Sequence, residues 1–264
     1  MPSIRVQEIV IDYPRDQTKA LLAFYASLTG FTPYLNETSP SLLENDHGVD
    51  LGLQPVDEYQ APTWPTQERG QQIHIDFATP DIDAAVRFAE SIGATRAVHQ
   101  PAEDKADDEF VVMLDPVGHP FCFVPHREPW DGPAAERPDG QPAISMRMPF
   151  IDCPDHRALA EFYVSLLDGS PAGQPDDEYV AVHTAGGAVL GFQRVDGYRA
   201  PTWPTQERGQ QLHMDLATDD LAAAKAHALA CGATIAFEPP GKARHVVMLD
   251  PAGHPFCLGG PYDE

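Results

Sequence analysis

The segment VVMLDPVGHPFC, at residues 111–122, returns almost unchanged as VVMLDPAGHPFC at residues 246–257. A second segment, APTWPTQERGQQ, occurs letter for letter at residues 61–72 and at residues 200–211. Shorter matches follow in the same order, with only small gaps between them. Self-similarity at this spacing marks an internal repeat, and the chain therefore consists of two homologous halves of roughly domain size.

The stretch between the two halves is rich in proline, glycine and charged residues, as is typical of a linker. We expect a first domain over residues 1–126, a linker over residues 127–142 and a second domain over residues 143–264. A chain of 264 residues with 42% hydrophobic content is long enough to bury a sizeable core.

A smaller pattern of strands and a helix occurs twice in each half. Residues 6–11 are rich in β-branched side chains, which favours a strand, and residues 18–28 carry apolar side chains at helical spacing. Short strand-like runs continue to residue 54, and then the order restarts. The restarted order comprises strands at 72–79, 95–98, 110–114 and 121–124, with a helix at 81–92. The pattern predicts an α+β protein built from four βαβββ units.

Composition restricts the location and the partners of the protein. The formal net charge of -23 repels phosphate backbones and anionic lipids, so we expect no nucleic acid or membrane partner. There is no apolar run long enough to span a membrane, and the N-terminal residues do not resemble a signal peptide. Four scattered cysteines indicate free thiols. These features favour a cytoplasmic protein.

Three motifs carry a resemblance to a known family. HIDFAT at residues 74–79 and HMDLAT at 213–218 each precede an alanine-rich helix, and both halves contain LDPxGHPFC. These motifs and the unit order resemble the vicinal oxygen chelate superfamily, which includes glyoxalase I, bleomycin-resistance proteins, fosfomycin-resistance enzymes and extradiol dioxygenases. They are most similar to its glyoxalase-like branch, common in tandem form among actinobacterial proteins of unassigned role.

The resemblance implies a specific architecture. Two βαβββ units pair so that their mixed sheets curl around a cleft, and a metal ion, where a member has one, lies on the floor of that cleft. We expect two glyoxalase-like domains, each formed by the two units of one half and related by an approximate two-fold axis. Four units in one chain could form a monomer with this internal symmetry, or two chains could form a homodimer.

The polar face of two matching strands is the first candidate site. Side chains alternate along a strand, so Gln72, His74 and Asp76 lie opposite the apolar residues between them. The second half repeats this arrangement with Gln211, His213 and Asp215. Two interpretations remain open: a half-solvated strand whose histidine and aspartate pair with neighbours, or a cleft-facing strand whose histidine touches a ligand or metal ion.

A catalytic metal site needs about three protein ligands and an open position. The resemblance implies that these ligands come from the first and last strands of two paired units. Only the histidine is a common ligand in both halves, since glutamine is a poor one, a thiolate changes the metal preference, and the opening strand of the second half offers no ligand. We expect no metal site and no cofactor, with His74 and His213 as weak candidates. The sets are Glu8 or Ile9, Gln54, His74 and Cys122 in the first half, and Met148 or Pro149, Gln193, His213 and Cys257 in the second.

Other polar residues receive structural interpretations. Cys122 and Cys257 are expected to pack as buried strand cysteines. His119 and His254 follow a turn glycine and are expected to be solvated hairpin residues. Asp12 and Asp152 end their strands and are expected to cap the helix region that follows.

Two functional hypotheses remain. In the first, each half holds a small aromatic or antibiotic-like organic molecule in its cleft without a complete metal site. The candidate ligand-binding residues are Gln54, Trp64, Gln72, His74, Asp76, Gln193, Trp203, Gln211, His213 and Asp215. The alternative is a metal-dependent lyase, isomerase or dioxygenase, or a metal-free enzyme in which the histidine beside the aspartate acts as a general base. No catalytic residue can be assigned from the sequence.

The identical segments at 61–72 and 200–211 are connections, which normally diverge fastest. Prolines stiffen both, and Trp64 and Trp203 can anchor them. We expect ordered loops with both tryptophans largely buried at the cleft rim or between the halves. We also expect Glu68 and Arg69 to pair with each other or with the twin loop. Local gene conversion is the alternative explanation.

Overall fold

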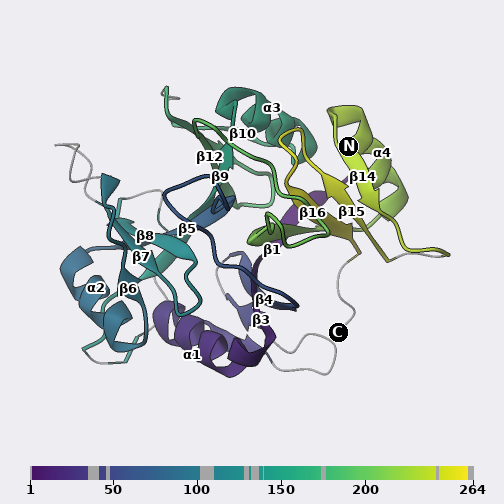
Figure 1. Ribbon diagram of the computed structural model, residues 1–264. Coiled ribbons are helices and arrows are strands. Elements are labelled where there is room, and N and C mark those ends of the chain that lie inside the picture. Colours follow the sequence, from purple (N-terminus) through teal and green to yellow (C-terminus); the bar gives the residue numbers. More distant parts are fainter. Residues whose placement is uncertain are drawn as a thin grey trace.

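The computed structural model describes residues 2–34, 42–45, 48–101, 110–127, 131, 137–138, 140–173, 177–241 and 244–260. Figure 1 shows four βαβββ units arranged in two curled, mixed sheets with the helices on their outer sides, which confirms the expected fold class. Most of the expected linker, namely residues 128–130, 132–136 and 139, lies outside the described residues. No described helix is long and apolar enough to cross a membrane.

The units follow one another along the chain. The first contains β1 (Ile4–Pro14), α1 (Thr18–Thr29), β2 (Thr32–Tyr34), β3 (Leu42–Glu44) and β4 (Asp50–Val56). The second contains β5 (Ile73–Thr79), α2 (Ile82–Ser91), β6 (Thr95–Arg96), β7 (Val111–Leu114) and β8 (Pro120–Pro125). The third contains β9 (Ser145–Cys153), α3 (His156–Leu166), β10 (Ser170–Ala172), β11 (Tyr179–His183) and β12 (Val189–Arg194). The fourth contains β13 (Leu212–Thr218), α4 (Leu221–Cys231), β14 (Thr234–Phe237), β15 (His245–Leu249) and β16 (Pro255–Gly259).

Local sequence signals set the helix boundaries. Asp81, Asp155 and Asp220 precede α2, α3 and α4, and each side chain accepts a hydrogen bond from a backbone N–H in the first turn. Gly30 ends α1 at a φ of 78°, a left-handed conformation that glycine adopts without strain. The expected helices and strands are thus present, with ends shifted by up to three residues.

The pairing of the units differs from the expectation. Sheet A has the strand order β14-β15-β16-β13-β1-β4-β3-β2, and sheet B has the order β10-β11-β12-β9-β5-β8-β7-β6. The first unit therefore shares a sheet with the fourth, and the second with the third (Figure 1). The expectation that the two units of one half form one sheet was wrong. The reason is that β1 pairs antiparallel with β13, and β5 pairs antiparallel with β9.

Units of the same half meet instead through their helical sides. Phe24 of α1 packs against Phe121 of β8 with ring centroids 6.1 Å apart. The Tyr25 hydroxyl donates to the buried Asp115 at 2.9 Å, and in the second half Tyr163 donates to Asp250 at 3.1 Å. One apolar core cluster combines residues of all four units. Strand pairing across halves and helix packing within halves thus join the four units into one body.

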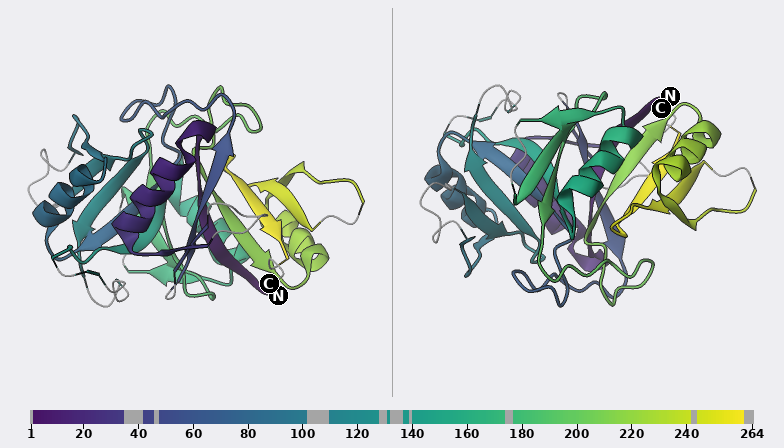
Figure 2. Two further views of the ribbon diagram at one scale, coloured as in Figure 1. Left: turned by 90° about the horizontal axis from the view of Figure 1, so that it is seen from below. Right: turned by 90° about the horizontal axis from the view of Figure 1, so that it is seen from above.

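The two identical segments cross between the sheets. Residues 57–72 run from β4 in sheet A to β5 in sheet B, and residues 195–211 run from β12 in sheet B to β13 in sheet A. Figure 2 shows these loops side by side at one edge of the molecule. The Gln72 amide donates to the Arg199 carbonyl at 3.1 Å, and the Gln211 amide donates to the Gln60 carbonyl at 3.1 Å.

The reciprocal contact is a better explanation for the identity of the two loops than the expected ion pairs are. Arg69 donates to Ala61 of its own loop at 3.0 Å, and Arg208 lies 3.7 Å from Glu207 of its own loop. The twin loops are joined by glutamines, not by Glu68 or Arg69. Both segments are ordered, but the tryptophans are half-buried and not largely buried as expected. Each loop contacts the other through a glutamine side chain and a backbone carbonyl, so both Gln72 and Gln211 are needed for the reciprocal contact.

Candidate functional site

Each sheet has an inner face, turned away from the helices, which we call face A on sheet A and face B on sheet B. Residues paired across neighbouring strands share a face. On sheet A, Glu8 pairs with Asp215, and Asp215 pairs with Cys257. On sheet B, the matching row contains Met148, Asp76 and Cys122. Pairing across the halves therefore places Glu8 beside His213 and Asp215, and not beside His74 as the sequence had suggested.

Both faces contain a histidine beside an aspartate. The His74 Nε2 atom lies 3.5 Å from Asp76, and the His213 Nε2 atom lies 3.4 Å from Asp215. Burial alone lowers the pKa of each histidine. The hydrogen bond and the negative charge of the neighbouring aspartate outweigh that effect, so the pKa of His74 and of His213 is raised. Each histidine is therefore more easily protonated than a histidine buried without an acidic neighbour.

A second feature shared by the faces is a buried aspartate held by two glutamines. Asp152 accepts hydrogen bonds from Gln71 at 3.1 Å and from Gln193 at 2.6 Å. Asp12 accepts in the same way from Gln210 at 2.9 Å and from Gln54 at 2.9 Å. Neither aspartate caps a helix, so the capping expectation was wrong. Gln71 and Gln210 come from the crossing loops, which therefore anchor directly in the faces.

The faces differ at two matching positions of their opening strands. On face B the ring of Phe150 stacks on His74, with centroids 5.5 Å apart and planes inclined by 10°. On face A the corresponding residue is Val10, which pairs with His213. One pair further along, face B has Met148 where face A has Glu8.

A glycine makes room for the distinctive side chain on each face. A Cβ atom at Gly191 would lie 2.6 Å from the Phe150 ring, so the ring lies directly on the glycine backbone. A Cβ atom at Gly52 would lie 2.5 Å from the Glu8 carboxylate. Each face therefore supports a different group on the same kind of backbone surface.

Glu8 has an unusual electrostatic environment. Its side chain is buried, and burial together with the charges of Asp215 and Asp50 raises its pKa from 4.5 to about 7, although His213 opposes the shift. Burial likewise raises the pKa of Asp12 to about 6. Face A thus concentrates carboxyl groups that exchange protons near neutral pH, whereas face B has methionine and phenylalanine in that region.

Face B carries two apolar clusters on either side of His74. Half-buried Trp64 packs on the first, which contains Ala78, Ala97, Val112, Cys122 and Val124. Half-buried Phe150 packs on the second, which contains Met148, Ala172 and Ala181. Tyr179 contacts Phe150 edge to face, with centroids 5.8 Å apart, and is 44% exposed. Face B is therefore an apolar, aromatic surface around a polar centre.

The remaining candidate residues lie near these centres in different roles. Gln54 and Gln193 reach the buried aspartates, as described above. Gln72 and Gln211 adopt φ values of 61° and 63° and turn toward the opposite crossing loop. Trp203 is half-buried, like Trp64.

The structure tests the expectations about the turn histidines and the cysteines, and they differ in outcome. His119 and His254 are both only 2% exposed, so the expectation of solvated hairpin residues was wrong. His254 lies 3.1 Å from Asp250 and 3.0 Å from the Tyr198 hydroxyl. All four cysteines are free, as expected, and Cys122 packs in an apolar cluster, although on face B and not in the helix-side core.

The residues of face B fit a metal ion only in part. Among the described residues, His74, Asp76 and Cys122 form a group whose ligand atoms all lie within 4.8 Å of one another. Burial, followed by the charge of Asp76, raises the pKa of the Cys122 thiol well above its usual range, which keeps it protonated. A metal ion at this group would have to displace the thiol proton, so its binding would release a proton and depend on pH. Within the described part of the chain, the matching group of face A does not converge to the same distance.

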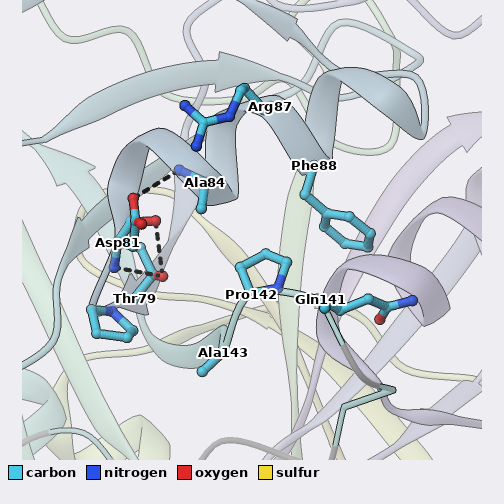
Figure 3. Close-up of a pocket in the computed structure, with 10 residues that line it drawn as sticks. Thr79, Asp81, Ala84, Arg87, Phe88, Gln141, Pro142 and Ala143 are labelled. Atoms are coloured by element: carbon cyan, nitrogen blue, oxygen red, sulfur yellow. Dashed lines mark hydrogen bonds between the residues drawn. The ribbon is translucent and has the colours of Figure 1, made fainter.

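A pocket of about 500 Å³ lies away from both faces (Figure 3). It is lined by the first turns of α2 and by residues 140–143 of the segment that leads into β9. The N-terminus of α2 is already capped, because Asp81 accepts a hydrogen bond from the Ala84 N–H at 2.9 Å. The capping carboxylate occupies the position that an anion would take, so the pocket carries no evident chemistry.

Sequence reasoning missed several residues of the two faces. It overlooked Gln71 and Gln210 because it treated their segments as connections, and it assigned Phe150 no role because it sought metal ligands. It considered Glu8 only as a ligand beside His74. The repeated glutamine pair at the end of each identical loop was the available signal for the aspartate contacts.

Comparison with known proteins agrees with this architecture. The model of the glyoxalase-like domain matches residues 8–124 and 148–259. The structure of glyoxalase I from Zea mays is similar with a TM-score of 0.62 at 14% identity, over 98% of this chain and 92% of that chain. A candidate dioxygenase from Bacillus subtilis is similar with a TM-score of 0.64 at 12% identity, over 99% of this chain and 86% of that chain. At these identities the likeness shows the fold alone. No curated protein sequence matches the chain significantly. Because the domain model covers most of the chain in two copies, the chain belongs to the glyoxalase-like domain family of the vicinal oxygen chelate superfamily.

Proposed function

We propose that the protein binds small organic molecules on its two inner faces, and that face B takes a neutral aromatic ligand without a metal ion. The observation that carries this proposal is the arrangement of face B. Aromatic and apolar side chains surround a buried polar centre, as in sites that hold small organic ligands. Trp64 lies on one side of His74, and Phe150 and Tyr179 lie on the other.

The polar centre supports this proposal because it has unused hydrogen-bonding capacity. His74 is 7% exposed, and its Nδ1 atom has no hydrogen-bond partner among the described residues. A buried polar atom without a partner costs about 1–3 kcal/mol. A hydroxyl or carbonyl group of a ligand would supply the partner. The matching Nδ1 atom of His213 lies 3.1 Å from the Gln210 amide, so face A has no such vacancy at its histidine.

A metal-dependent lyase, isomerase or dioxygenase is the second candidate function. The convergence of His74, Asp76 and Cys122 within 4.8 Å favours it. The apolar residues Met148 and Phe150 disfavour it, because they leave the opposite strand without a ligand. Metal analysis of the purified protein decides between the candidates. One zinc, iron, manganese or nickel ion per chain that is lost in His74→Ala would favour the enzyme.

Binding to face B can be tested with 1-naphthol as a neutral aromatic probe. The methyl group of Met148 lies on face B, whereas Met113 is fully buried in the core. In protein with isotope-labelled methionine methyl groups, we expect 1-naphthol to shift the NMR signal of Met148 and to leave that of Met113 unchanged. Phe150→Ala should weaken this binding at least tenfold, because it removes the ring beside the proposed ligand position.

Tyr34→Ala is the matched control, since Tyr34 is an exposed aromatic residue on sheet A. This variant should bind 1-naphthol at face B like the unchanged protein. If 1-naphthol leaves the Met148 signal in place at millimolar concentration, or if Phe150→Ala binds it equally well, face B is not the proposed site.

A further inference from the structure

We propose that face A binds an organic cation, such as a protonated aromatic amine, and therefore selects a different class of ligand from face B. This inference rests on the proposed function, since it names the ligand chemistry of one of the two faces. It is argued from the Glu8 carboxylate, its charged neighbours and the aromatic side chains at the two ends of the face.

Glu8 is a buried carboxylate with no hydrogen-bond partner. Its side chain is 5% exposed, and within the described residues it accepts no hydrogen bond and forms no ion pair. It lies on the inner face, because its carboxylate covers the backbone of Gly52. Taking a carboxylate out of water is costly unless a partner compensates it. An uncompensated group of this kind in the middle of a binding face indicates a missing positive partner.

The surroundings of Glu8 add further negative charge. Asp215 and Asp50 are its direct cross-strand neighbours, and both act to raise its pKa. Among the described residues, no lysine or arginine forms an ion pair with Glu8, Asp12 or Asp50. His213 is the positive group that faces them, and its own charge is already directed at Asp215. A cationic ligand would relieve this repulsion.

The spacing of the carboxylates favours an organic cation over a bare metal ion. A metal site requires ligand atoms that converge on one point. Within the part of the chain that the structure describes, one such group occurs on face B, formed by His74, Asp76 and Cys122. On face A the ligand atoms of Glu8, His213 and Asp215 do not form such a group. Carboxylates spread along a face suit a larger and more diffuse charge.

Exposed aromatic side chains lie at both ends of face A. Tyr34 pairs with Leu42, which pairs with Gly52, so Tyr34 shares the face of Glu8. Phe237 pairs with Val247, which pairs with Cys257 beside Asp215. The two rings are 42% and 48% exposed. Aromatic rings attract organic cations through their π faces, so a ligand long enough to reach from Glu8 toward either end of face A would meet a favourable surface.

Calorimetric titration with benzylamine and benzyl alcohol tests this inference. The two probes differ mainly in the positive charge of benzylamine. In protein treated with a chelator at pH 7.5, we expect benzylamine to bind at least tenfold more tightly than benzyl alcohol. Glu8→Gln should abolish this preference. Phe237→Ala changes an exposed residue four strands from Glu8 and should leave the binding of this short probe unchanged.

The controls separate this inference from the proposed function. Tyr179→Ala, on face B, should leave benzylamine binding unchanged, and Glu8→Gln should leave 1-naphthol binding unchanged. Equal affinity for the two benzyl compounds, or a preference that persists in Glu8→Gln, would overturn the inference while 1-naphthol binding still supports face B. The inference is also overturned if zinc or manganese ions bind in a manner that depends on Glu8 while benzylamine does not bind.

Discussion

Faces A and B have the same arrangement of strands and differ in some of the side chains that these strands carry. Both have a histidine beside an aspartate, a strand cysteine, and a second aspartate held by two glutamines. Face A adds Glu8 and Val10, where face B has Met148 and Phe150. At the centre of each face the difference lies on the opening strands β1 and β9, while Asp50, Tyr34 and Phe237 of face A and Tyr179 of face B lie on other strands. The comparison teaches that the repeated motifs preserve the side chains common to both faces, and that the diverged opening strands determine which class of ligand each face favours.

The crossed assembly accounts for this division. Each face combines one strand that has stayed alike, β13 or β5, with one that has drifted, β1 or β9, and the two come from different halves. A half that paired only with itself would combine β1 with β5, or β9 with β13, and each opening strand would then lie beside the histidine of its own half. In the crossed arrangement, each half supplies a histidine to one face and the distinctive opening strand to the other.

Separating the halves should have the largest effect, because each sheet needs strands from both. Without residues 143–264, β1 and β5 lose their antiparallel partners β13 and β9 and expose long edges. We expect residues 1–126 alone to lack a cooperative thermal transition as a monomer. Mixing with residues 143–264 should restore a one-to-one complex with the melting behaviour of the intact chain. A monomeric, cooperatively folded half would contradict the crossed assembly.

Replacing Glu8 should have the next largest effect, and its sign depends on pH. The Glu8 pKa is raised from 4.5 to about 7, so the folded state keeps this proton where the unfolded state releases it. Its contribution to stability is therefore fully present below pH 4.5 and is lost as the pH rises to 7. Glu8→Gln should unfold with a free energy about 2 kcal/mol higher than the unchanged protein at pH 8, and with a similar one at pH 4.5.

Urea denaturation at both pH values measures this difference. The value is set below the full shift because relaxation of the site around the charged carboxylate offsets part of the cost. Glu90→Gln, which changes an exposed carboxylate on α2, should alter stability by less than about 0.5 kcal/mol at either pH. A Glu8→Gln variant that is less stable at pH 8 would mean that the carboxylate has a partner after all.

The glycines should show the smallest but most selective effect. Gly191→Ala forces the Phe150 ring away from His74, and overpacking of this kind costs about 1–3 kcal/mol. Gly52→Ala meets the end of the flexible Glu8 side chain, which can turn aside, and should cost less. Thermal unfolding of the two variants under the same conditions gives the comparison. A larger loss in Gly52→Ala would show that the two faces do not differ as described.

The sequence predicted the unit order, the helices and the polar strands, because these depend on local periodicity and caps. Asp81 and Gly30, for example, mark helix ends in the structure as the sequence indicates. The sequence could not predict the crossed pairing. Two homologous halves contain equivalent strands, so β5 could pair with β1 or with β9 on pattern alone.

The same limit explains which site residues were found. His74 and His213 follow from strand alternation, whatever their partners are. The position of Glu8 beside His213 depends on which strands pair, and Phe150 has a role only because it stacks on a histidine from the other half. Contacts between distant segments decide both, and a single sequence does not contain them.

A crystal structure of the protein exposed to benzylamine and 1-naphthol together would test the central claim most directly. The account predicts benzylamine on sheet A, with its ammonium group within hydrogen-bonding distance of Glu8 and its ring against face A. It predicts 1-naphthol on sheet B, beside Phe150 and with its hydroxyl at His74 Nδ1. Both compounds on the same face, or each on the face assigned to the other, would contradict the claim that the opening strands determine the chemistry of the two faces.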